Sequence, residues 1–165
     1  MVEDRIFRLG EIVKIFGCKP HIVIHLIELG LIIPFENVKG RGKSRGYSFK
    51  NVVEIGIFLL LNKLNISHER IRVILRSIDE YTGFHCENLT FLSVIGMFDP
   101  GPEFVSLHIN TWSKEGKEAT PQEFLKRSVA SWKKDKHVTD DDFALYVVLE
   151  LRNVIKNILT KISGL

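Results

Sequence analysis

Residues Lys39 to Asn51 read KGRGKSRGYSFKN, a basic, glycine-spaced segment that leads directly into an expected helix. It holds five cations and no acidic residue, whereas the whole chain has a formal charge of only +3, so the remaining residues are net negative. Its glycines allow a tight, exposed ribbon, and Ser48 is a suitable N-cap for the helix. Such a local positive charge favours a polyanionic partner, of which the phosphate backbone of duplex DNA is the commonest. The alternative is a solvated loop whose charges only keep the protein in solution.

Composition indicates one or two small globular domains. The chain has 165 residues, of which 45% are hydrophobic and 26% are charged, so it can bury a core. Residues 1–83 carry 13 Lys and Arg against 9 Asp and Glu, which makes this half the better candidate for nucleic acid. Two cysteines, Cys18 and Cys86, form no disulfide framework, and no signal sequence opens the chain, so we expect a cytoplasmic protein. The most apolar run, Ile55 to Leu61, is far shorter than the roughly 20 residues that cross a bilayer, so no membrane partner is expected.

The N-terminal half shows the pattern of a winged helix-turn-helix. A short first helix is expected to end at Gly17, and a second, begun by Pro20, to end at Gly30. Two short helices joined by a glycine turn form a helix-turn-helix, whose second helix normally enters the major groove. A short extended piece, the basic wing, a helix over 49–64 and a helix from His68 to about Glu80 should follow.

The order and spacing of these pieces carry a resemblance. They read RLGEIVKIFG, CKPHIVIHLIELGLI, Arg45-Gly46-Tyr47-Ser48 and KLNISHERIRVIL. Together they resemble the winged-helix DNA-binding domain of the MerR family of transcriptional regulators, over residues 5–78. The resemblance implies that Arg45 meets a phosphate and that Tyr47 anchors the wing to the domain.

The expected recognition helix is unusually apolar for a DNA reader. Where the family usually has a threonine and an arginine facing DNA, this chain has Ile22 and Ile24, which cannot make bidentate contacts to bases. In one interpretation the helix still docks, using Lys19, His21 and His25 for phosphate and the isoleucines against thymine methyl groups. In the other, its apolar face is covered by another subunit or by the C-terminal half, and DNA reading is weak or lost.

The C-terminal half predicts a separate α+β domain. Residues 81–89 are interpreted as a linker between a DNA-binding domain, 1–80, and a dimerisation or effector domain, 90–165. Strand-like runs over 90–98 and 104–112 predict an antiparallel pair, and a helix is expected from Thr120 to about Lys136. A long last helix is expected to start near Thr139. The predicted fold class is therefore mainly α with a small α+β part, containing a strand pair and a long C-terminal helix.

An a/d repeat in this last helix predicts a dimer seam. Apolar residues recur at spacings of four and three over three heptads, as Ala144, Val148, Leu151, Ile155, Ile158, Ile162 and Leu165. A helix packed on its own domain is the alternative. Regulators of the resembled family pair through a C-terminal helix, so a homodimer is favoured.

Chemical sites are weakly indicated. His85 and Cys86 are adjacent, but no Cys-x-x-Cys or His-x-x-x-His pair occurs, so neither a metal nor a cofactor is expected. A catalytic pair of Cys86 with His85 or His108 has no further support, and we expect no enzyme. Four aromatic residues form either core or a pocket for an apolar effector, namely Phe104, Trp112, Phe124 and Trp132.

These observations predict a cytoplasmic, homodimeric DNA-binding transcriptional regulator with a possible small-molecule or protein effector. Its contacts with double-stranded DNA are expected from the wing and the second helix, through Lys19, His21, His25, Lys39, Arg41, Lys43, Arg45 and Tyr47. Two alternatives stay open. One is an accessory factor of the phage excisionase or small terminase type, and the other is a protein-interaction adaptor that binds through Ile22, Ile24 and Ile27.

Overall fold

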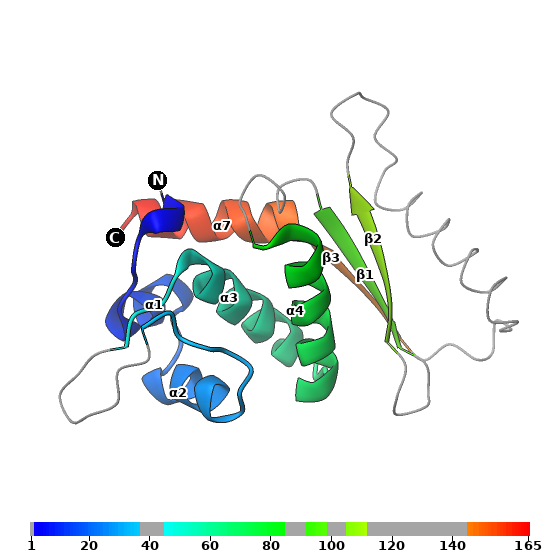
Figure 1. Cartoon of the computed structure of the whole chain (residues 1–165), viewed down its shortest axis with the longest axis horizontal. Coiled ribbons are helices and arrows are strands. Elements are labelled where there is room, and N and C mark those ends of the chain that lie inside the picture. Colours follow the sequence, from blue (N-terminus) through cyan, green and yellow to red (C-terminus); the bar gives the residue numbers. More distant parts are fainter. Residues whose placement is uncertain (1, 37–44, 85–91, 99–104, 112–144) are drawn as a thin grey trace, which may run out of the picture. The chain divides into compact units, whose positions relative to one another are not determined.

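The chain folds into two compact units in a computed structural model, which describes residues 2–36, 45–84, 92–98, 105–111 and 145–165. The first unit comprises Met1–Cys86 together with Asn153–Leu165, and the second comprises Glu87–Arg152. A 3-10 turn, Val2–Asp4, precedes the helices of the first unit (Figure 1). None of the described helices is long and apolar enough to cross a membrane.

The predicted helix-turn-helix is present. Helix α1 spans Leu9–Phe16 and ends at Gly17, whose φ of +60° lies in the left-handed region that glycine adopts without strain. The carboxylate of Glu11 accepts a hydrogen bond of 2.8 Å from the Arg8 N–H, which satisfies one of the free donors at the start of α1. Helix α2 spans Pro20–Glu28 and has the proline in its first turn.

Two longer helices follow as their caps predict. Helix α3 spans Phe49–Lys63, and the Ser48 hydroxyl oxygen accepts a 3.3 Å hydrogen bond from the N–H of Asn51. Helix α4 spans His68–Thr82, with the Ser67 hydroxyl oxygen in the same role. This helix ends two residues later than its predicted end, and so takes the first part of the expected linker.

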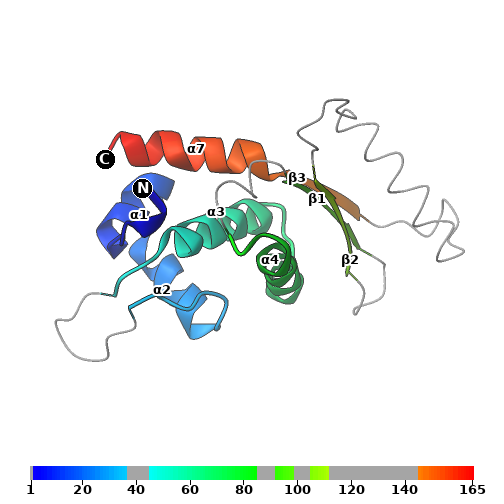
Figure 2. The same ribbon diagram turned by 45° about the horizontal axis from the view of Figure 1, so that its top comes forward.

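The C-terminal helix belongs to the first unit except for its first two residues. Helix α7, Leu151–Ser163, lies beside α1 and α3 in both views (Figures 1 and 2). A Cβ atom added to Gly56 of α3 would lie 3.0 Å from Cδ1 of Ile158 and 3.0 Å from Cε1 of Phe16, so a glycine here permits the close approach of the three helices. The division into domains therefore differs from 1–80 and 90–165, because the end of the chain completes the N-terminal unit.

The second unit contains a three-stranded antiparallel sheet. Strands β1 (Leu92–Phe98), β2 (Val105–Thr111) and β3 (Leu145–Glu150) have the order β2-β1-β3. In the register, Phe98 of β1 lies opposite Val105 of β2 on one side and opposite Leu145 of β3 on the other.

The predicted fold class is wrong in its C-terminal part. Where the structure describes side chains, the chain is 70% helical, with five helices and no strand. The backbone of the second unit forms a sheet of three strands and not the expected pair, because β1 has a neighbour on each side.

The prediction of a long C-terminal helix from near Thr139 is also wrong, because residues 145–150 form a strand. The predicted dimer seam is therefore not continuous. Val148 lies in β3, and Ala144 lies outside the described residues. Residues 145–150 read LYVVLE, rich in the branched and aromatic side chains that favour strands. A short apolar run of this kind matches part of a heptad by chance, because its length cannot separate the two periods.

Several predicted features fall outside the described residues. They include three wing cations, the His85-Cys86 pair, the helix expected over 120–136, the helix start near Thr139 and the four C-terminal aromatic residues. The three wing cations are Lys39, Arg41 and Lys43.

Candidate nucleic-acid interface

Helix α2 exposes the polar residues that the sequence assigns to DNA. Lys19, His21 and His25 are exposed, whereas Val23 and Leu26 are buried in the core at 0% and 1% exposure. This alternation follows the helical period, which places residues three and four apart on one face. The first unit thus presents one polar side of α2 outward.

The isoleucines of α2 occupy the border between the core and the surface. Ile22, Ile24 and Ile27 are all partly exposed, and none is among the strongly exposed hydrophobic residues. They are not covered completely, nor do they form an open apolar face. The apolar face proposed for an adaptor is therefore not evident on α2.

His25 connects α2 to the start of α4. Its ring lies 6.4 Å from the ring of His68 in an edge-on arrangement, and His68 lies 5.3 Å from the ring of Phe58. Nδ1 of His25 is 3.7 Å from the carboxylate of Glu28. The far end of α2 is tied to α4 as well, since the Arg72 guanidinium donates a 2.9 Å hydrogen bond to the Leu29 carbonyl. Contacts at both ends of α2 thus join it to α4.

The base of the wing is a ladder of backbone hydrogen bonds. Phe7 and Tyr47 exchange bonds of 2.8 and 2.9 Å, and Glu36 and Gly46 exchange bonds of 3.0 and 3.1 Å. A Cβ atom at Gly46 would meet the Glu36 side chain and lie 2.8 Å from Cγ2 of Ile6, so a larger residue there would displace these two side chains. The predicted wing tip itself lies outside the described residues.

Tyr47 is buried at the base of the wing, where its backbone pairs with Phe7. Its side chain is 1% exposed, and burial raises the pKa of its phenol while the charge of Arg45 opposes the rise. A buried ring cannot touch DNA, so this position does not suit the predicted DNA contact of Tyr47. It suits the anchoring of the wing base that the resemblance implies. Arg45, two residues earlier, is partly exposed at the point where the wing leaves the domain.

Other cations near the wing base are engaged with acids. Arg5 contacts Glu11 at 2.6 Å, and Arg8 contacts Glu36 at 2.9 Å. Lys50, the last cation of the basic segment, places its ammonium 2.6 Å from the carboxylate of Asp79. Lys50 thus links α3 to α4.

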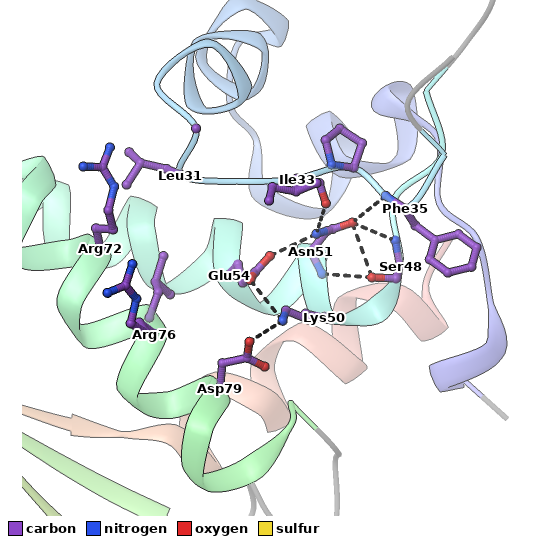
Figure 3. A pocket seen from close by; sticks show the side chains of 13 residues that line it. Leu31, Ile33, Phe35, Ser48, Lys50, Asn51, Glu54, Arg72, Arg76 and Asp79 are labelled. Carbon is purple, nitrogen blue, oxygen red and sulfur yellow. Dashed lines mark hydrogen bonds and ion pairs between the residues drawn. The ribbon is translucent and has the colours of Figure 1, made fainter.

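A polar network that sequence reasoning missed lies behind the wing. The Asn51 amide donates 3.0 Å hydrogen bonds to the Ile33 carbonyl and to the Glu54 carboxylate (Figure 3). Its oxygen accepts bonds of 3.2 Å from the N–H groups of Phe35 and Ser48. The sequence carries two local signals for this network, the capping-box spacing of Ser48 and Asn51 and the spacing of Lys50 and Glu54 along one face of α3.

The network borders a cavity of about 460 Å³ between α3, α4 and residues 30–35. Arg72 and Arg76 of α4 line one side of it (Figure 3). Ile33 and Phe35 line the other side and are the most exposed large hydrophobic residues described, at 78% and 69%. The Phe35 ring points away from the network (Figure 3).

Within this network, the carboxyl group of Glu54 has a raised pKa. Burial raises its pKa to about 7, against the hydrogen bond from Asn51 and the positive charge of Lys50, whose ammonium lies 4.0 Å away. A carboxyl group with this pKa exists in both protonation states near neutral pH.

No candidate metal centre occurs among the residues that the structure describes. Cys18 is a free, partly buried thiol, and burial raises its pKa. Sequence comparisons with known protein families and with curated proteins find no match to this chain.

Proposed function

We propose that this chain is a DNA-binding transcriptional regulator of the MerR-like winged-helix type. It contacts duplex DNA through Lys19, the N-cap of α2, through His21 and His25 of α2, and through Arg45 and the other cations of the wing. The observation that carries the proposal is the pairing of an outward polar side of α2 with a laddered wing base that leads into the basic segment. Phosphate contacts of this kind position a protein on DNA, and bases are then read through the major groove.

The salt dependence of binding to random duplex DNA tests this proposal. Fluorescence anisotropy over a salt series should show affinity falling steeply, because each phosphate contact releases condensed counterions. Arg45→Ala should weaken binding about equally on all sequences and reduce the slope of log K against log salt by roughly one unit.

Lys156→Ala is the matched control for this experiment. Lys156 is an exposed cation of α7, a helix that lies on the other side of α3 from α2 (Figures 1 and 2). Its removal changes the net charge by the same amount, so it should leave the salt slope as it is. Equal slopes for Arg45→Ala and the unchanged protein would remove Arg45 from the interface.

A homodimer is part of the proposal, but the apolar face of α7 does not form its contact. The four seam residues on this helix are 0% to 6% exposed within a single chain. Two copies would therefore have to pair through another surface to place two winged domains on one operator. The proposed homodimer and any effector do not depend on the a/d seam.

A protein-interaction adaptor is the second candidate, and a different surface favours it. Ile33 and Phe35 are strongly exposed beside two arginines, a combination that is common where proteins bind one another. Absence of DNA binding even at low salt would favour this function. The adaptor would then bind through Ile33 and Phe35, and a Phe35→Ser variant should lose its protein partner.

A further inference from the structure

A second cavity of about 450 Å³ lies in the first unit, where α3, α7 and the α1–α2 turn come together. Its lining is apolar along the helices, with Phe16, Ile22 and Leu59 from the N-terminal helices and Ile158 from α7. Gly56 also lines it, at the point where Phe16 and Ile158 pack so closely on α3 that a Cβ atom at Gly56 would lie 3.0 Å from each side chain. The volume lies in the range of small-molecule sites.

The charges that line this cavity all have one sign. Lys63, the last residue of α3, and Lys161, in the last turn of α7, are its ionisable ammonium groups, and no carboxylate lines it. Both lysines are exposed, and within the described part of the chain no ion pair engages either of them. An apolar lining with two cations and no acid is complementary to a molecule that has an apolar body and an anionic head.

We propose that this cavity binds a small anionic amphiphile of the fatty-acid class. The hydrocarbon chain lies along Phe16, Leu59 and Ile158, where it is removed from water, and the carboxylate lies between Lys63 and Lys161. Burial of methylene groups supplies most of the affinity, and the two ammonium groups select an anion over a neutral molecule. This site is independent of the wing and of the polar side of α2, so it stands or falls separately from DNA binding.

Titration calorimetry of the full chain with decanoate measures this binding directly, with decanol and decylamine as neutral and cationic comparisons. Decanoate should bind more tightly than decanol, and decylamine should bind least. The double variant Lys63→Gln, Lys161→Gln should weaken decanoate binding about tenfold, since two exposed ion pairs together contribute roughly 1.4 kcal/mol. Its effect on decanol should be small.

A cysteine in the lining reports where the ligand sits. Cys18 lines the cavity, and in a Cys86→Ser background it is the only thiol of the chain. Decanoate should slow the alkylation of Cys18 by iodoacetamide several-fold. Val154→Trp, which enlarges a partly exposed residue of the lining, should remove both the binding and the protection while circular dichroism shows a folded protein.

Lys156→Gln is the control, because it removes an exposed lysine of the same helix that does not line the cavity. It should bind decanoate like the unchanged protein. The proposal is overturned if decanoate does not bind, or if the double variant loses no more affinity than this control. It is equally overturned if bound decanoate leaves the alkylation rate of Cys18 unchanged.

Discussion

At the scale of the residue, Glu54 makes stability depend on pH near neutrality. Its pKa is about 7 in the folded chain against an ordinary value of 4.5, so between these values the folded state holds a proton that the unfolded state has released. The free energy of unfolding should therefore fall as pH rises through this window, by about 1.4 kcal/mol per unit and by about 3 kcal/mol in all. Glu54→Gln replaces the ionisable carboxyl with a neutral amide of the same shape. The variant should therefore be about 2 kcal/mol more stable than the unchanged protein at pH 8. Urea denaturation at pH 5, 6, 7 and 8 measures the difference.

Glu69→Gln is the control for this pH series. Glu69 is exposed on α4, and its replacement should leave the slope between pH 5 and 8 unchanged. Glu11 affects stability in a separate pH range. The hydrogen bond from the backbone N–H of Arg8 lowers the pKa of Glu11, so the stability that this carboxylate contributes is lost only as pH falls below 4.5. A parallel pH profile for Glu54→Gln and the unchanged protein would show that Glu54 is ionised throughout.

At the scale of the element, Asn51 joins the start of α3 to the chain before the wing. Its side chain is 3% exposed and bonds to the backbone of Ile33, Phe35 and Ser48. Asn51→Leu fills the same volume but leaves these groups without their partner, so the free energy of unfolding should fall by about 3 kcal/mol. Asn62→Leu, at an exposed position of the same helix, should change it by less than about 0.5 kcal/mol. Equal unfolding midpoints for the two variants would contradict the role of Asn51.

The same element shows what the sequence could predict. Helix boundaries at Gly17, Pro20, Ser48 and Ser67 follow from local signals, because a cap acts within one turn of its own residue. The link from Lys50 to Asp79 spans 29 positions, and no local pattern specifies it. Sequence reasoning therefore located α3 and its cap but not the partner of Lys50.

At the scale of the whole molecule, the apolar repeat near the C-terminus had two interpretations, a dimer seam or a helix packed on its own chain. An apolar repeat with a period near 3.5 is expected for both, because it indicates only that one face of a helix is buried and not what covers that face. The packing of Ile158 against Gly56 of α3 distinguishes them, because the covering surface belongs to the same chain.

These interpretations differ in how stability depends on protein concentration. Ile158→Ala leaves a cavity in the core of the first unit, so the free energy of unfolding should fall by about 3 kcal/mol. For packing within one chain this loss is the same at all protein concentrations, whereas a loss at a dimer seam shifts the unfolding midpoint with concentration. Chemical denaturation at two concentrations a hundredfold apart, with Lys156→Ala as control, measures this. A midpoint for Ile158→Ala that moves with concentration, together with a drop in sedimentation coefficient, would restore the seam as an interface between copies.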